Sequence, residues 1–423
     1  MSALPWSLLP NSAREADDGS LLIGGCSVLE LAAEYGTPLF IYDEDHLRNR
    51  CQEAAASFGD QAVYAGKAFL CLAMARLVHE EGLRIDVASG GELFVALAAG
   101  VPGERLVMHG NNKSLAELHA AARARVGRLV VDSFDEFELI ENVHEETGFV
   151  FDVLVRVTPG IEAHTHHYLA TGQDDSKFGF TLSTGQAAKA IATARSSPAV
   201  RLRGVHVHIG SQVFEAKSFA AALAVMAPIV DAHQLDELSM GGGLGVAYVE
   251  GEQAPTLSEY GSILREAALA AGLTATLAVE PGRSIVAGAA ITVYTIGTIK
   301  EVTGFRTYVA VDGGMSDNPR PVLYGSGYET FLPRAVRADR NRTVRVVGKH
   351  CETGDVLVRE GKVPEDLRVG DLIATPVTGA YGHSMGSNYN KVPRPPVVFA
   401  RNGDARLVVA RESYDDLIRN DRL

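Results

Sequence analysis

Cysteine is scarce in this chain, with four residues among 423, at positions 26, 51, 71 and 351. None of them forms a Cys-x-x-Cys pair, so their spacing indicates neither a zinc site nor a thioredoxin-like redox motif, and we expect no metal. The first twenty residues also lack the basic segment and the apolar stretch of a secretory signal. These absences predict a cytoplasmic protein with reduced thiols.

Positive charge is also in short supply. The chain has 39 Lys and Arg against 52 Asp and Glu, which gives a net charge of -13. Nucleic acids and anionic membranes attract basic surfaces, so this balance disfavours both as partners. No apolar run is long enough to span a bilayer. The hydrophobic fraction of 46% is ordinary for a globular protein, and the length suggests two or three domains.

Between about residues 39 and 286, short apolar segments alternate with amphipathic stretches rich in Ala and Leu. This alternation predicts βαβ units with a parallel sheet, and its repetition predicts an eight-fold (β/α)8 TIM-type barrel. A doubly wound open sheet is the alternative, but no Gly-x-Gly-x-x-Gly fingerprint opens the first helix. The strands expected in this part are 39–42, 62–65, 84–88, 106–109, 128–131, 153–157, 204–208, 237–240 and 277–280.

After residue 286 the pattern changes to β-branched strands joined by Gly, Pro and Asp turns, with almost no helix signal before 414–419. This pattern predicts a second, mostly antiparallel β domain, closed as a barrel or packed as a sandwich. We therefore expect residues 36–287 to form the barrel, and residues 1–35 with 288–423 to form the β domain.

Lys67 lies in the apolar run Val63–Leu70. Burying an ammonium without a partner is costly, and burial lowers its pKa, which frees the amine to form a Schiff base with an aldehyde cofactor. The alternative is a lysine at a strand end that extends its head group into water. The run by itself does not decide between them.

Other polar residues follow the expected strands at their carboxyl ends, where barrel enzymes carry their catalytic groups. Asp86 and Ser89 lie at the end of one strand, and His208–Ser211, Gly241–Gly243 and Glu280–Arg283 lie at the ends of three others. The glycine triplet can turn backbone N–H groups toward a phosphate, although glycine triplets also form plain turns. Ser211 and Arg283 would add a hydroxyl and a charge for the same anion.

Glu280 could pair with a protonated ring nitrogen and so make a pyridine ring an electron sink. A salt bridge to the nearby Arg283 is the alternative. His208 could stack on a flat ring or only pack in the core. His206 is expected to face the same way as His208, because side chains alternate along a strand, so only one of the two needs to be functional.

The β domain contains a second group of polar motifs. Arg320 stands between two prolines, which stiffen its loop, and a fixed guanidinium suits the capture of a carboxylate. Cys351 and Glu352 place a thiol beside a carboxylate in a turn. The segment Gly379–Asn390, which includes Tyr381, is rich in polar and aromatic groups. Each of these motifs is also compatible with an ordinary turn.

Together these residues resemble the alanine-racemase-like, fold-type III pyridoxal-phosphate decarboxylases, and within them the diaminopimelate decarboxylases. The resemblance runs nearly end to end. Ornithine-type relatives carry Cys-Asp where this chain has Cys351-Glu352. The more specific motifs are residues 167–172 with 175–179, 317–321, 351–355 and 388–390.

The resemblance implies decarboxylation of meso-2,6-diaminopimelate to L-lysine and CO2, the last step of lysine biosynthesis, with pyridoxal 5'-phosphate as cofactor. A related decarboxylase that acts on ornithine, lysine or a carrier-bound amino acid is the alternative. The substrate carries a second amino-acid head, and Arg320 and Glu352 are of the right types for its carboxylate and its ammonium. A substrate without that head would leave them unpaired.

The resemblance also implies a role for each residue. Lys67 would bind the cofactor covalently, His208 would stack on its ring, and Cys351 would donate a proton in a homodimer with shared active sites. The expected cofactor-binding residues are Lys67, Asp86, Ser89, His208, Ser211, Gly241, Gly242, Gly243, Glu280, Pro281, Gly282, Arg283 and Tyr381. The expected substrate-binding residues are Arg283, Arg320, Tyr324, Glu352 and Tyr381.

Overall fold

The computed structural model describes residues 3–160 and 173–423, so the motif at 167–172 lies outside the described residues. The chain divides into two units. Unit 1 contains residues 1–49, 247–253 and 285–423, and unit 2 contains residues 50–246 and 254–284. Among the described residues, no helix has the length and apolar character to cross a membrane.

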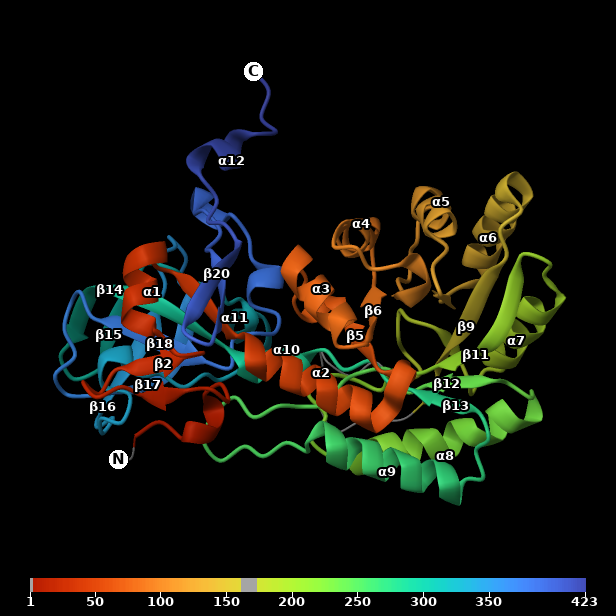
Figure 1. The fold of residues 1–423 in the computed structure, drawn as a ribbon, viewed down its shortest axis with the longest axis horizontal. Coiled ribbons are helices and arrows are strands. Elements are labelled where there is room, and N and C mark those ends of the chain that lie inside the picture. The colour runs from red at the N-terminus through yellow and green to blue at the C-terminus, as the bar shows by residue number, and fades with distance from the viewer. Residues whose placement is uncertain (1–2, 161–172) are drawn as a thin grey trace. The chain divides into compact units, whose positions relative to one another are not determined.

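Unit 2 is built on eight parallel strands that follow one another around a barrel (Figure 1). The first and last strands close it, because Val63 N donates to Val279 O at 2.9 Å. The expected barrel is therefore confirmed, and the open sheet is wrong. The strands are β5 (Val63–Ala65), β6 (Arg84–Val87), β7 (Leu106–Met108), β8 (Arg128–Val131), β9 (Phe151–Thr158), β11 (Val200–His206), β12 (Glu237–Ser239) and β13 (Thr276–Ala278), and the short β10 (Phe180–Thr181) pairs with β9.

Helices alternate with these strands along the chain, and several begin at a side-chain cap. Ser114 and Glu117 form a capping box on α5, and Thr256 and Glu259 form one on α9. Such caps satisfy backbone N–H groups that have no partner within the helix, so they fix where each helix begins. The helices are α3 (Leu72–Glu80), α4 (Gly90–Ala98), α5 (Leu115–Ala124), α6 (Phe134–Thr147), α7 (Gln186–Ser196), α8 (Ala216–Ala232) and α9 (Leu257–Ala270), while α2 (Glu44–Phe58) and α10 (Arg283–Val286) run across unit boundaries.

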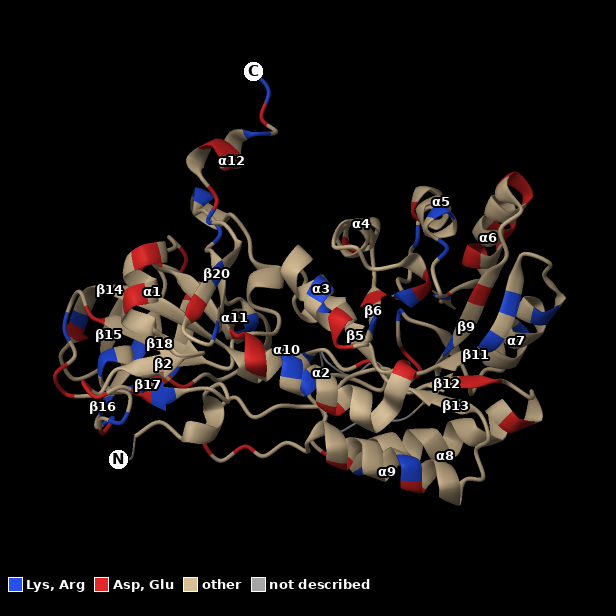
Figure 2. Cartoon of the chain, in the orientation of Figure 1, with Lys and Arg blue, Asp and Glu red and all other residues tan. Residues whose placement is uncertain are grey.

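Helix α8 carries almost no charge, as Figure 2 shows. Seven of its residues are buried, and its Phe219 ring lies 4.8 Å from the Tyr260 ring of α9. Burying this face removes apolar surface from water, which stabilises the barrel by about 25 cal/mol for each Å² buried. Inside the barrel, Val63, Val107, Val130 and Leu154 form a buried cluster.

Unit 1 contains a mostly antiparallel sheet with the order β17-β16-β15-β14-β4-β19-β20, and β18 also pairs with β14. The second, mostly antiparallel β domain expected from the sequence is confirmed. The strands are β4 (Leu39–Asp43), β14 (Ala290–Val302), β15 (Arg306–Val311), β16 (Arg342–Val347), β17 (Val356–Val363), β18 (Leu372–Pro376), β19 (Val397–Arg401) and β20 (Asp404–Val409). A smaller sheet contains β1 (Arg14–Glu15), β2 (Leu21–Ile23) and β3 (Cys26–Ser27), and the unit's short helices are α1 (Val28–Tyr35), α11 (Arg320–Tyr324) and α12 (Tyr414–Ile418).

The strand expected at 39–42 is present as β4, but its expected place in the barrel is wrong. It pairs with β14 on one side and with β19 on the other. All five of its residues are buried. A short, continuously apolar run indicates that a strand is buried, but it does not indicate which strands pair with it. The run at 39–42 is therefore compatible with either sheet.

Candidate active site

The polar residues expected at strand ends in the barrel do gather at one end of unit 2. Lys67 follows β5, Asp86 lies in β6, His208 follows β11, Gly241–Gly243 follow β12, and Glu280–Arg283 follow β13. Because all eight strands are parallel, their carboxyl ends share one rim of the barrel. The structure thus brings the barrel part of the expected site together.

Lys67 is exposed, and it lies in a short 3-10 turn at Gly66–Ala68 directly after β5. The sequence left two alternatives open for Lys67, and the structure places it at the end of a strand with its side chain exposed. The turn lies close to the end of β6, because a Cβ on Gly66 would meet Asp86 O at 2.7 Å. Burial, and then the positive charge of Lys67, hold the pKa of His208 well below its usual range, so His208 is neutral beside the lysine.

Glu280 is the buried centre of the site, with 5% of its surface exposed. Its Oε2 accepts a hydrogen bond from His206 Nε2 at 3.1 Å, and its Oε1 accepts one from Ser239 Oγ at 3.0 Å. Burial on its own would raise the pKa of Glu280, but the neighbouring histidines outweigh burial and hold the pKa well below its usual range. Glu280 is therefore a carboxylate anion inside the protein.

His109 completes this cluster from the end of β7. Its Nε2 lies 3.3 Å from Glu280 Oε1 and 3.9 Å from Asp86 Oδ2. Burial would lower the pKa of His109, but the charges of Glu280 and Asp86 raise it, whereas burial keeps the pKa of His206 low. The two carboxylates thus favour the charged form of His109, and His206 is a neutral donor.

The sequence interpretation missed two features of this cluster. It required only one functional histidine between positions 206 and 208, whereas His206 binds Glu280 and both lie at the barrel end. His109 was not singled out, although it follows a strand directly, as the other site residues do. The donor atoms of His109, His206 and Glu280 lie within 4.8 Å of one another, and all three residue types can bind a metal ion. Both carboxylate oxygens of Glu280 already accept hydrogen bonds, so Glu280 is the centre of a hydrogen-bonded cluster.

The glycine triplet packs so tightly that no side chain fits. A Cβ on Gly242 would lie 2.2 Å from Glu280 O, and one on Gly243 would lie 2.0 Å from Gly210 O. Within the described ranges, the N–H groups of Gly242 and Gly243 donate no hydrogen bond. Unpaired N–H groups in a glycine turn form a cradle that suits a phosphate.

Two further polar residues lie at this end of the barrel. Arg283 Nη2 donates to Ser211 Oγ at 2.9 Å, which joins a guanidinium to a hydroxyl at the ends of two strands. Ala65 N donates to Pro281 O, and a Cβ on Gly282 would meet Ala65 Cβ at 2.9 Å. The turn 280–283 therefore packs directly against the strand that precedes Lys67.

Asp86 and Ser89 have different environments at the end of β6. Asp86 is buried, and its Oδ1 has no hydrogen-bond partner among the described residues, so it is an acceptor that a bound group could satisfy. Ser89 is the N-cap of α4, where its Oγ accepts from Glu92 N at 3.2 Å. The local role of Ser89 is thus to begin a helix.

The remaining expected residues belong to unit 1. Arg320 and Tyr324 lie on α11, and Arg320 is buried. Cys351 and Glu352 are exposed on a loop, and Tyr381 is half-buried with a left-handed φ of 56°.

Hydrogen bonds hold the Cys351 loop in place. Cys351 N donates to Asn390 Oδ1 at 3.0 Å. Asp355 accepts from His350 N at 2.9 Å and from Met315 N at 2.7 Å, so one carboxylate connects this loop to the loop that precedes Arg320. Two motifs that lie far apart in the sequence are therefore tied together within unit 1.

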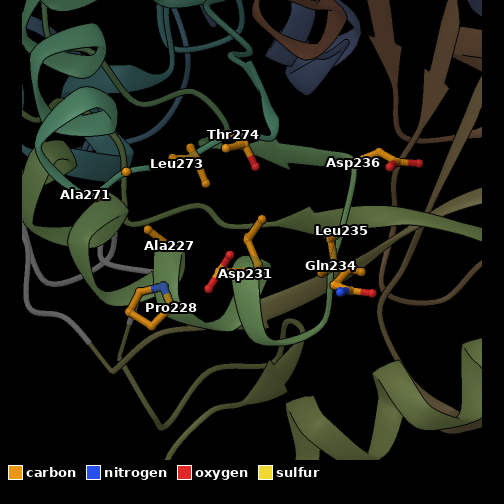
Figure 3. Close-up of a pocket in the computed structure, with 11 residues that line it drawn as sticks. Ala227, Pro228, Asp231, Gln234, Leu235, Asp236, Ala271, Leu273 and Thr274 are labelled. Carbon is orange, nitrogen blue, oxygen red and sulfur yellow. The ribbon is translucent and has the colours of Figure 1, made fainter.

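A cavity of about 590 Å³ in unit 2 lies away from these residues. As Figure 3 shows, its walls come from the ends of α8 and α9 and from the segments that lead into β12 and β13. Its polar side chains Asp231, Gln234, Asp236 and Thr274 are exposed. This cavity is at the amino ends of the strands, opposite the rim that carries Glu280.

Comparisons with known proteins agree with this arrangement. Residues 44–287 match the family described as pyridoxal-dependent decarboxylase, pyridoxal binding domain. The chain is 46% identical to the diaminopimelate decarboxylase of Bacillus subtilis, with 98% of each chain covered, and 46% identical to that of Mycobacterium tuberculosis, with 97% of this chain and 96% of the relative covered. The crystal structure of the M. jannaschii diaminopimelate decarboxylase in complex with L-lysine superimposes with a TM-score of 0.90 at 33% identity, and covers 98% of each chain.

Proposed function

Because this chain belongs to the pyridoxal-dependent decarboxylases, and among them to the diaminopimelate decarboxylases, we propose that it converts meso-2,6-diaminopimelate to L-lysine and CO2. Pyridoxal 5'-phosphate is its cofactor. The observation that carries the proposal is the buried, anionic Glu280 beside the glycine cradle. An anion at this place favours a protonated ring nitrogen, and the cradle suits the phosphate of the same molecule.

The residues at the barrel rim fit this cofactor. When bound, it supplies a protonated aromatic ring that accepts the electron pair left by the departing CO2. Lys67 would hold the cofactor covalently, and the neutral His208 would lie against its ring without adding charge. Gly241–Gly243, Ser211 and Arg283 would bind the phosphate. Glu280 would keep the ring nitrogen protonated.

The residues of unit 1 supply substrate recognition and a proton in this proposal. Arg320 binds the distal carboxylate and Glu352 the distal ammonium, while Tyr324 and Tyr381 contribute contacts. Cys351 carries a thiol, an acid that can donate a proton to the substrate carbon that has lost CO2. We further propose a cytoplasmic homodimer in which Cys351 serves the active site of the partner subunit.

Cofactor absorbance combined with a substrate panel tests this function. The purified protein should have a visible absorbance band that borohydride removes, and the reduced cofactor should stay attached to Lys67. Lys67→Ala should lose the band and its activity. CO2 release should be fastest with meso-diaminopimelate. Faster release from ornithine or lysine would replace this function with the alternative within the family.

A further inference from the structure

Arg320 has an unusual environment for a buried cation. Only 4% of its surface is exposed, and its guanidinium carbon lies 3.6 Å from the centre of the Tyr248 ring and 5.3 Å from that of Tyr328. Its Nη1 donates to Tyr328 Oη at 3.1 Å. In the part of the chain that the structure describes, no ion pair includes Arg320. Two tyrosines thus surround a guanidinium that has no carboxylate partner there.

The nearby carboxylates have other partners. Glu252 accepts from Tyr248 N at 2.7 Å, which shapes the segment 247–253 that carries this tyrosine. Glu329 pairs with Arg340 at 2.8 Å. These contacts fix the loop around Arg320 and leave its charge without a counterion from this region.

A buried charge without a partner is costly unless something else compensates it. Aromatic faces attract a cation and recover part of that cost. They do so without occupying the N–H donors of the guanidinium. Because Tyr328 engages Nη1, the edge formed by Nε and Nη2 is left for a planar acceptor, and that edge matches a carboxylate in two-point contact.

We propose that Tyr248 and Tyr328 are positioning residues that hold Arg320 as a preformed receptor for the second carboxylate of the substrate. This inference rests on the proposed function, because it deepens the role given there to Arg320. Tyr248 fixes the plane of the guanidinium by stacking, and Tyr328 fixes its rotation through one hydrogen bond. Together they select an amino acid that carries a carboxylate at its far end.

The test uses two variants that remove one contact each. Tyr248→Leu removes the stacking ring, and Tyr328→Phe removes the hydroxyl and keeps the ring. In the holoenzyme, each should raise KM for meso-diaminopimelate about tenfold and change kcat less than twofold, because the receptor binds a part of the substrate far from the reacting bond. Cofactor absorbance should not change. Tyr248→Phe should keep the wild-type KM, and Tyr308→Phe on β15 is the matched control.

A pair of inhibitors separates this role from a general disturbance of the site. L-Lysine carries the distal carboxylate, and cadaverine is the same diamine without it. The inhibition constant of L-lysine should rise about tenfold in Tyr248→Leu and in Tyr328→Phe, while that of cadaverine should not change. Equal changes for both inhibitors, or an unchanged KM, would overturn the inference. If the proposed function itself were wrong, the wild-type protein would not prefer meso-diaminopimelate, so the two outcomes can be told apart.

Discussion

At the residue scale, Glu280 and Arg320 are both buried charged groups, but their surroundings stabilise them in different ways. Each is an ionised group taken out of water, which is unfavourable unless charges or dipoles replace the lost hydration. Glu280 has three polar neighbours in place, so its charge is fixed before any ligand binds. Arg320 has aromatic neighbours, so its charge is held in place and remains available to a ligand.

The donors around Glu280 lead to a first prediction. His206→Phe leaves a buried carboxylate oxygen without its donor, which costs about 1–3 kcal/mol. The pKa of Glu280 should rise, and pyridoxal phosphate should bind about tenfold more weakly in a titration of the apoprotein followed by fluorescence quenching. His206→Asn keeps a donor group and should recover most of the affinity. An unchanged dissociation constant in His206→Phe would mean that His206 does not support the carboxylate.

Asp317 leads to a second prediction, on pH dependence. Burial raises the pKa of this carboxyl to about 7, well above its usual value. Between pH 4 and pH 7 the folded state therefore holds a proton that the unfolded state has lost, so stability falls as the pH rises through this window. Asp317→Asn cannot ionise and should lose less stability than wild type, with a difference of a few degrees in Tm between pH 5 and pH 8. Parallel Tm profiles for the two proteins would contradict this.

At the element scale, the turns after the barrel strands are fixed by close packing of backbone against backbone. The loop after β12 touches the chain at the ends of β11 and β13, because Gly242 and Gly243 have no side chains. The same contacts place the cradle next to Glu280. Gly242 and Gly243 therefore determine both where this loop lies and whether its backbone can form the cradle.

Gly242→Ala tests this dependence. Its Cβ would lie 2.2 Å from Glu280 O, so the turns after β12 and β13 must separate. We expect at least a tenfold loss of affinity for pyridoxal phosphate, measured by absorbance titration. Gly297→Ala on β14 is the control, because its Cβ would meet only Ala310 O at 4.0 Å. Full affinity in Gly242→Ala would show that the cradle tolerates a side chain.

Most of the fold could be predicted from the sequence, because apolar residues recur with a different period in strands than in helices. Turn residues and helix caps also mark where these elements begin and end. The apolar strand β4 was assigned to the wrong sheet, since its pattern contains no information about its partners. Whether Lys67 is buried could not be decided from the sequence, because an apolar run gives no sign of the point where the strand ends.

The candidate site could be predicted where residues stand in motifs after strands. Tyr248 could not be found in this way, since its contact with Arg320 joins positions 72 residues apart that no periodicity connects. Asn390 lies in a motif that the sequence does indicate, but its hydrogen bond with the backbone of Cys351 could not be predicted from that motif. Contacts of this kind depend on tertiary structure, which the local pattern does not determine.

At the scale of the whole molecule, the proposed homodimer can be tested with two inactive variants. Lys67→Ala and Cys351→Ala should each lose most of their activity. If each active site combines residues of two subunits, mixing the variants under conditions of subunit exchange forms dimers with one intact site, and activity should recover to about a quarter of wild type. Recovery would be absent if both residues serve the active site of their own subunit.

The pairing of β4 with β14 and β19 also affects how the protein is made. The chain leaves the ribosome from its N-terminus, at roughly 5–20 residues per second. The barrel of unit 2 has all its strands once residue 284 has emerged, whereas β4 must wait for partners that begin at residues 290 and 397. All five residues of β4 are buried in the finished protein. This apolar segment therefore stays unpaired during most of synthesis, so the nascent chain depends on protection of this segment from aggregation.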